Sequence, residues 1–366
     1  MPHPLSPLQT TVTRRGMLAG ALASLTLGLA ACHGDDTSRA ASPGATSASG
    51  SGSEPAGPSP FPETVKHAWG STTITSRPSR VATVGWGGQD ALIALGLAPV
   101  GMPRANYGDE DGDGMLPWVK EGLAKLGATG SKAPAMYDET NSIVVEAVAN
   151  TDPDLVVGLN SGMTKEEYAK LSRIAPTLPY FEKAWNISWQ AHTQTVAKAL
   201  GQQAKGEEVV AACRKAIDEA VAAQPAMTGR TAAMFYLDPK KLSTLSVYTT
   251  GDSRADYLTD LGLAVPASVK KLSAKSDQFY TEVSAENADM FDDVDVIVSY
   301  GDPATLLEAL RSNPLLARVR AVKNGCVAVI GDNTALAASM SPTALSIPAR
   351  VGELTRTIGA AAAKVA

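Results

Sequence analysis

Hydrophobic residues near the start of the folded region form short runs that alternate with helically spaced segments. Val81 to Val84 is an apolar run that predicts a buried strand, and a Gly-rich turn follows it. Gln89 to Leu95 has the spacing of a helix that ends at Gly96, and Ala98 to Met102 predicts a second strand. A strand, a helix and a strand with brief connections predict a β-α-β unit, and therefore a parallel sheet.

The alternation continues along the rest of the chain. A loosely alternating segment predicts a β-hairpin over Thr64 to Thr75, before the first strand. A helix at Lys165 to Arg173 and a helix running into a strand over Arg254 to Val265 have clear helical spacing. Further strands are predicted at Asp154 to Leu159, Thr177 to Phe181, Thr231 to Asp238, Ser243 to Thr250 and Val294 to Tyr300.

Two stretches of the first half match two stretches of the second half in the same order. Gln89 to Val100 resembles Ala255 to Pro266. Val145 to Leu159 resembles Ala285 to Tyr300 with one inserted residue. One match would carry little weight, because any unit of helix, glycine and strand looks alike. Two matches in one order predict two similar α/β lobes.

A long helix is predicted between the two halves, over residues 202–224. Apolar residues such as Cys213 and Ile217 recur there at helical spacing, and a proline follows the end. A helix of about 23 residues is about 35 Å long, which is the width of a small lobe. We therefore expect an N-terminal lobe at 61–201 and a C-terminal lobe at 225–366, with a stiff connection and little motion between them.

The first 31 residues have the charge order of an export signal. They contain no Asp or Glu, and Arg14 and Arg15 precede an apolar segment of about 15 residues, which is too short to span a membrane. The adjacent arginines predict a twin-arginine (Tat) signal peptide over residues 1–31. A general secretory signal with a chance arginine pair is the alternative.

Small residues directly before Cys32 resemble a bacterial lipoprotein box, in which the cysteine thiol is acylated, typically with palmitate. Residues 32–60 are dominated by Gly, Ser, Ala, Thr and Pro, so they cannot bury enough apolar surface to offset their ordering entropy. They predict a flexible tether with a root-mean-square span of about 30 Å. The expected location is therefore outside the cytoplasm, anchored by lipid to the bacterial cell membrane.

The composition excludes some classes of partner. The formal net charge is -5, and a nucleic-acid-binding protein would favour a concentrated basic face, so no nucleic-acid partner is expected. Two cysteines remain after Cys32, and the sequence leaves open whether Cys213 and Cys326 form a disulfide or are free thiols. No run after the signal approaches the about 20 apolar residues of a membrane span.

The motifs of common enzymes are missing from the sequence. It contains no G-x-S-x-G, H-E-x-x-H, Walker A or C-x-x-C motif. His67 and His192 are the histidines of the folded region, and each is expected to be structural rather than a ligand. Because zinc and manganese sites favour several nitrogen or sulfur ligands, the sequence predicts no resident metal, no cofactor and no enzymatic activity.

One acidic loop partly matches a calcium-binding loop. Asp109, Asp111 and Asp113 occupy its first, third and fifth positions. Position 12, which should supply a bidentate Glu, is Lys120, and a proline interrupts the loop. A solvated acidic loop is the favoured interpretation.

The chain resembles the Fe(III)-siderophore and vitamin B12 class of ABC-transporter substrate-binding proteins. The resemblance rests on "VKHAWGSTTITSRPSRVATVGW", "QDALIALGLAPVG", "DPDLVVGLNSGMTKEEYAKLSRIAPT", "SRADYLTDLG" and "SMSPTALSIP", spread from Thr64 to about Pro348. It implies two α/β lobes bridged by a long helix, a shallow cleft between them for the ligand, and a monomer. It also implies capture of a ferric siderophore and delivery to an ABC importer.

A ferric siderophore needs aromatic faces for its organic shell and cations for the negative charge that many such chelates carry. Because ligands of parallel α/β sheets bind at the carboxyl ends of strands, residues that follow strands are the candidates. The predicted ligand-binding residues are Trp86, Arg104, Tyr107, Tyr137, Asn160, Ser161, Lys183, Trp185, Tyr248, Arg254, Tyr300 and Met340. For Arg254 a purely structural role at a helix start is disfavoured by the helix dipole.

Glu146 and Glu286 occupy equivalent places in the matched stretches, each at a helix start before a strand. In the family that the chain resembles, one surface glutamate on each lobe meets arginines of the permease. An acid in a first helical turn is also ordinary dipole complementarity.

Three other functions stay open. A haem or corrinoid binder of the same class is the nearest. An exported lipoprotein enzyme is disfavoured by the missing motifs, and a binding fold reused as an envelope interaction module would lack cations such as Arg104, Lys183 and Arg254 at the cleft.

Overall fold

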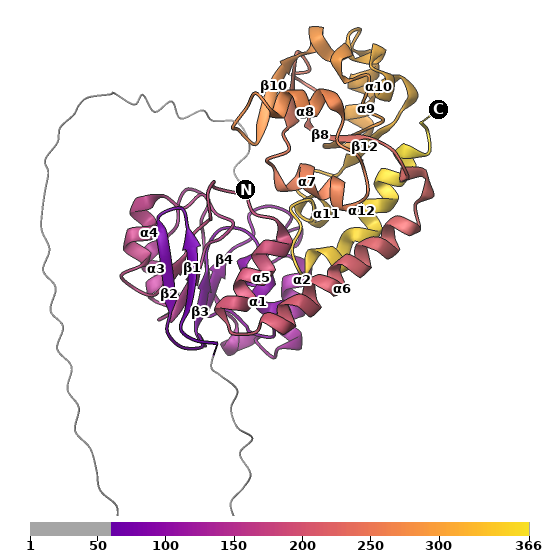
Figure 1. Ribbon diagram of the computed structural model, residues 1–366. Coiled ribbons are helices and arrows are strands. Elements are labelled where there is room, and N and C mark those ends of the chain that lie inside the picture. Colours follow the sequence, from indigo (N-terminus) through magenta and orange to yellow (C-terminus); the bar gives the residue numbers. More distant parts are fainter. Residues whose placement is uncertain (1–59, 366) are drawn as a thin grey trace, which may run out of the picture. The chain divides into compact units, whose positions relative to one another are not determined.

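Two five-stranded sheets form the cores of two lobes in this computed structural model, which describes residues 60–365 (Figure 1). The twin-arginine signal, Cys32 and nearly all of the predicted tether lie outside the described residues. Among residues 60–365, no helix is both long enough and apolar enough to cross a membrane.

The sheet of the N-terminal lobe is parallel throughout, as predicted. Its strand order is β5-β4-β3-β6-β7, so β3, the first strand of this sheet in the chain, lies at the centre. The strands are β3 (Val81–Thr83), β4 (Gly101–Pro103), β5 (Ala135–Tyr137), β6 (Leu155–Val157) and β7 (Thr177–Leu178). The predicted hairpin is confirmed as the antiparallel pair β1 (Glu63–His67) and β2 (Gly70–Ile74).

Helices connect the strands of the N-terminal lobe with short loops. Val81, Leu155 and Val157 of the central strands are fully buried, which explains why these strands appear in the sequence as continuous apolar runs. The helices are α1 (Gly88–Ala94), α2 (Pro117–Lys125), η1 (Gly130–Lys132), α3 (Val145–Ala149), α4 (Lys165–Leu171) and α5 (Trp189–Ala199).

The sheet of the C-terminal lobe is mixed. Its order is β10-β9-β8-β11-β12; β8 (Ala232–Tyr236), β11 (Val296–Tyr300) and β12 (Val327–Ile330) are parallel. The strands β9 (Thr244–Tyr248) and β10 (Tyr280–Ser284) run antiparallel to their neighbours at one edge. Its helices are η2 (Pro225–Met227), α7 (Ser253–Asp260), α8 (Ala267–Ser273), η3 (Ala285–Phe291), α9 (Pro303–Ser312), η4 (Leu316–Arg318), α10 (Arg320–Asn324), α11 (Ala335–Ala338) and α12 (Ser346–Ala362).

Two local predictions in this lobe were wrong in type. The strand expected after the helix at Arg254 is a single bridge between Ala264 and Thr231. The helix expected before β11 is the 3-10 helix η3, which is kinked at Asn287.

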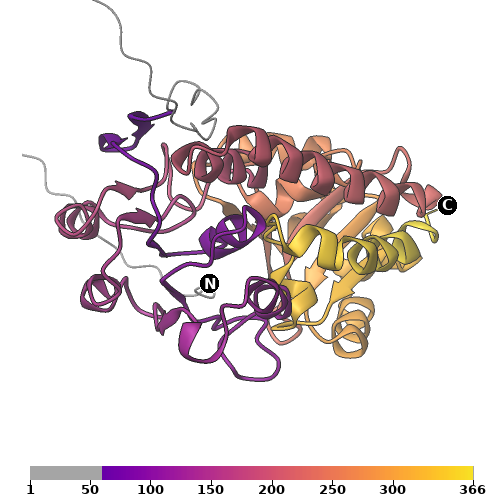
Figure 2. The same ribbon diagram turned by 90° about the horizontal axis from the view of Figure 1, so that it is seen from below.

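The long predicted helix is present as α6 (Gln203–Ala222), which is about 30 Å long. It packs against α5 of the N-terminal lobe and lies beside α12 (Figures 1 and 2). Its apolar side buries Val210, Cys213 and Ile217 in the core over one face of the C-terminal sheet. Cys213 and Cys326 are both buried free thiols, which resolves the alternative that the sequence left open.

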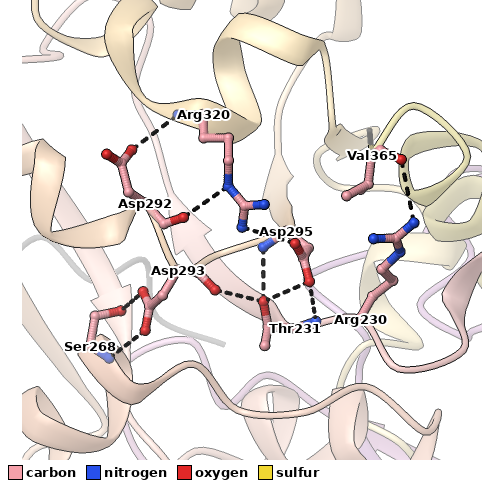
Figure 3. A network of polar contacts seen from close by, with 8 residues as sticks. All are labelled: Arg230, Thr231, Ser268, Asp292, Asp293, Asp295, Arg320 and Val365. Carbon is pink, nitrogen blue, oxygen red and sulfur yellow. Dashed lines mark hydrogen bonds and ion pairs between the residues drawn. The ribbon is translucent and has the colours of Figure 1, made fainter.

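A polar network fixes the amino ends of β8 and β11 (Figure 3). Thr231, just before β8, donates its backbone N–H to Asp295 over 2.9 Å, and its hydroxyl accepts the N–H of Asp295 over 2.9 Å. Arg320 pairs with the same carboxylate at 2.9 Å, and Asp293 accepts the backbone N–H of Ser268 at the start of α8. These contacts stabilise the amino ends of the parallel strands, on the side of the sheet opposite to their carboxyl ends.

Candidate functional site

Four of the predicted residues come together where the two lobes meet. Tyr107 follows β4 in the N-terminal lobe, and its ring lies 6.4 Å from the ring of Tyr300 at the end of β11, in an edge-on arrangement. Arg254, at the start of α7, places its guanidinium carbon 4.2 Å from the centre of the Tyr248 ring. We call Tyr107, Tyr248, Arg254 and Tyr300 the tyrosine-arginine cluster.

The cation of this cluster is held by a carboxylate two residues before it. Asp252 caps α7 and accepts hydrogen bonds from the backbone N–H, Nε and Nη2 of Arg254 at 2.8, 2.8 and 2.6 Å. Only 15% of the Arg254 side chain and 7% of the Asp252 side chain is exposed. The pair fixes the guanidinium plane over Tyr248. The guanidinium carbon of Arg254 also lies 5.9 Å from the centre of the Phe279 ring.

The three phenols of the cluster are neutral over the physiological pH range. Burial raises the pKa of Tyr248 to about 12. Burial also raises the pKa of Tyr300 and of Tyr107, and the hydrogen bond from the Tyr107 hydroxyl to Asp332, 2.8 Å long, raises the latter further. The cluster therefore offers aromatic faces and hydrogen-bonding hydroxyls rather than anions.

The N-terminal lobe contributes two tryptophans close to this boundary. The indole N–H of Trp86 donates to the carbonyl of Ser341, 3.3 Å away, and its backbone N–H donates to the carbonyl of Asn160. Trp185 has a positive φ of 62°, and its indole lies so close over Gly162 that a Cβ there would be 2.8 Å from Nε1. A side chain at Gly162 would displace this indole.

The two other predicted cations differ in their surroundings. Lys183 forms an exposed ion pair with Asp277 of the C-terminal lobe at 3.1 Å. Arg104 is exposed and packs over Gly114, and it forms no ion pair with any residue that the structure describes.

Residues 81–334 match the periplasmic binding protein family. The chain belongs to this family. Its members are substrate-binding transport proteins rather than enzymes. The fold is that of the class III members, with two sheet-containing lobes.

Known members of the periplasmic binding protein family align over most of the chain. PiaA of Streptococcus pneumoniae TIGR4, solved in complex with ferrichrome, is 39% identical; the match covers 83% of this chain and 99% of PiaA with a TM-score of 0.78. The probable siderophore-binding lipoprotein YfiY of Bacillus subtilis is 30% identical, covering 65% of this chain and 67% of YfiY. The Fe(3+)-citrate-binding protein YfmC of the same organism is 27% identical, covering 70% and 75%.

Three predicted residues of this periplasmic binding protein lie inside the lobes. Met340 has no exposed surface, and Tyr137 is 5% exposed and donates its hydroxyl to the carbonyl of Thr83. Ser161 is buried as well, and its hydroxyl donates to the carbonyl of Gly158. We leave these three out of the binding surface proposed below, because Met340 has no exposed surface and the hydroxyls of Tyr137 and Ser161 are bound to backbone carbonyls. Tyr248 is also buried, at 3% exposed, but its ring lies under the guanidinium of Arg254.

Several carboxylates near the boundary escaped the sequence analysis. Asp252 could have been found, because an Asp directly before a helical segment is a typical N-cap. Asp277 and Asp332 gave no signal, since their partners lie in the other lobe. Glu139 is a further case: one oxygen accepts the N–H of Gly85 at 2.8 Å, the other has no partner among the described residues, and burial raises the pKa of the carboxyl to about 8.

Glu146 and Glu286 are both exposed in the first turn of short helices, α3 and η3. Each helix leads into a central strand of its lobe, β6 or β11. Glu146 and Glu286 therefore occupy equivalent positions in the two lobes, each in the helix before a strand of the sheet.

The acidic loop contains three carboxylates that approach one another within 4.8 Å, those of Asp109, Asp111 and Asp113. Lys120 forms ion pairs with Asp111 and Asp113. The loop thus has its own cation from α2.

Proposed function

We propose that this protein captures a ferric siderophore outside the cytoplasm and delivers it to an ABC importer. The tyrosine-arginine cluster is the observation that carries the proposal. A siderophore already fills the coordination shell of iron, so its binding site needs aromatic faces and hydrogen-bond donors rather than metal ligands. The cluster offers both, and PiaA, which shares 39% of its residues with this chain, was solved with ferrichrome.

The histidines agree with a site that binds a complete chelate. His67 is held in the β1-β2 hairpin, where Nδ1 accepts the backbone N–H of Trp69 and Nε2 lies 3.1 Å from the Thr72 hydroxyl. His192 is buried in α5. Neither histidine is available to coordinate iron at the boundary of the lobes.

The proposed location is the outer face of the cell membrane, with a lipid on Cys32 and residues 32–60 as a tether. The order of arginine pair, apolar segment, small residues and cysteine supports this, and the relative YfiY is described as a lipoprotein. Anchoring would keep a captured chelate beside the importer, and we propose that the protein works there as a monomer.

Glu146 and Glu286 are the residues proposed to dock on the permease. Their support is their exposure and their equivalent positions on the two lobes. A permease with two equivalent halves would meet one glutamate on each lobe.

Tryptophan fluorescence tests the proposed function, because Trp86 and Trp185 flank the cluster and iron chelates quench nearby indoles. Titration with ferrichrome, ferric citrate, iron-free siderophore, haem and cobalamin should give saturable quenching with at least one ferric siderophore and much weaker binding of the iron-free form. Trp185→Phe should reduce the amplitude of the quenching. The absence of saturable binding to any ferric chelate, or preference for haem or cobalamin, would refute the proposal.

A further inference from the structure

Two of the three cations expected at the ligand site are paired with carboxylates. Arg254 is paired with Asp252, and Lys183 is paired with Asp277. A third carboxylate, Asp332, accepts the hydroxyl of Tyr107. Two of these acids compensate the charges of Arg254 and Lys183, and the third places a further negative charge beside Tyr107.

Asp252 controls how Arg254 can meet a ligand. It occupies Nε and Nη2 with charge-assisted hydrogen bonds, which are strong and directional. The other amino group, Nη1, has no acceptor within the described part of the chain. The guanidinium is thus a fixed donor over Tyr248 whose charge is already compensated by a buried partner.

We propose that Asp252 is a specificity-determining residue that makes the site select ferric chelates without net charge over anionic ones. This inference rests on the proposed function. Three hydroxamate groups bring three negative charges to Fe³⁺, so a ferric trihydroxamate is neutral at its metal centre. Its hydroxamate oxygens accept hydrogen bonds from Nη1 and from the hydroxyls of Tyr248 and Tyr300, whereas ferric citrate complexes bring surplus negative charge against Asp252 and Asp332.

The buried setting of the pair gives Asp252 this influence. Charges interact more strongly where water is excluded, and Asp252 is, with Asp90, one of the two buried carboxylates among residues 60–365. Without it, the positive charge of Arg254 would be uncompensated beside the ligand. Like charges in contact across a binding surface weaken the binding of the wrong ligand more than they strengthen the binding of the right one.

The test compares the dissociation constants of ferrichrome and ferric dicitrate, measured by fluorescence quenching of wild-type protein and of Asp252→Asn. Wild type should bind ferrichrome at least about tenfold more tightly than ferric dicitrate at low salt. Asn keeps the size and the N-cap of Asp252 but removes its charge. The ratio should therefore shift by about tenfold toward the anionic chelate, and the shift should shrink at high salt.

Asp218→Asn is the matched control, because Asp218 is exposed on α6 and its loss removes the same charge. It should leave the ratio unchanged. Asp332→Asn is a second variant at an exposed position, which should shift the ratio in the same direction by about twofold or more even where Asp252→Asn folds poorly.

The inference is overturned if wild type prefers ferric dicitrate, or if the variants at Asp252 and Asp332 leave the ratio unchanged. Failure of wild type to bind any ferric chelate would instead refute the proposed function, so the two failures are distinguishable.

Discussion

Arg254 lies at the start of a helix, where the helix dipole disfavours a positive charge. Asp252, at the N-cap of α7, removes the conflict because its carboxylate compensates both the guanidinium and the unpaired backbone N–H at that end of the helix. A single acid thereby compensates the end of the helix and fixes the Arg254 side chain over Tyr248. The cation would be unfavourable here without its neighbour.

His192 predicts a pH dependence of stability. It is buried in α5, its Nε2 has no partner among the described residues, and burial lowers its pKa to about 4. Its pKa in the unfolded chain is about 6.5, so the unfolded state binds the proton more readily below that pH. The contribution of neutral His192 is complete above about pH 6.5 and is lost as pH falls toward 4, by up to about 3 kcal/mol.

Chemical denaturation of wild type and His192→Leu at pH 7 and pH 4 checks this expectation. The variant should gain up to about 3 kcal/mol relative to wild type on acidification, because leucine takes up no proton. The difference in the free energy of unfolding between the two proteins isolates His192. Burial raises the pKa of Asp90 to about 6, which makes the stability of both proteins change in the opposite direction over the same pH range. A difference between the two proteins that does not change with pH would contradict the prediction.

At the scale of elements, α5 and α6 approach each other closely at a glycine. A Cβ on Gly206 of α6 would lie 2.4 Å from the Cβ of Ala197 on α5, so Gly206→Ala forces the helices apart. We expect a loss of about 1–3 kcal/mol in the free energy of unfolding.

Gly352 in α12 is the matched control. A Cβ there would meet only the flexible end of Arg356, at 3.7 Å, so Gly352→Ala should stabilise the protein by about 0.5–1 kcal/mol through helix propensity. Thermal and urea denaturation of both variants measures the effects. Stabilisation by Gly206→Ala would show that the close approach of the helices is not needed.

The sequence predicted central elements better than edges. The strands β3, β6 and β11 are fully buried runs, and their apolar character alone reveals them. The edge strands β5, β10 and β12 were not predicted: β5 and β10 are partly exposed and depend on pairing with a neighbour, and β12 was missed although it is a buried apolar run. For the same reason the sequence suggested parallel units in both lobes, while the C-terminal sheet is mixed.

At the scale of the whole molecule, the candidate site depends on contacts that no local pattern reveals. Residues following strands were good candidates because the parallel strands of a sheet end at one edge, and Tyr107 and Tyr300 follow or end such strands in the two different sheets. The acids that balance the cations could not be predicted across lobes. Asp332 lies 225 residues from Tyr107, and Asp277 lies 94 residues from Lys183.

The proposed docking of both lobes on the permease gives the remaining prediction. Glu146→Ala combined with Glu286→Ala should leave the dissociation constant for the chelate unchanged, because both side chains are exposed and neither belongs to the cluster, but should abolish uptake of ⁵⁵Fe-labelled siderophore by cells. Glu166→Ala combined with Glu282→Ala is the control, because both side chains are also exposed and the double variant loses the same charge. A large loss of affinity in the double variant would refute the docking assignment.

The contacts between the lobes also set an order of assembly during synthesis. The carboxylate of Asp90 accepts the hydroxyl of Thr343, 253 residues later in the chain, and Gly108 and Glu110 bond to Asn333 and Ala335. The N-terminal lobe therefore cannot complete its own packing until residues near Thr343 have left the ribosome. A nascent chain that stops short of this segment has every strand of its first sheet and still lacks the partners that finish it.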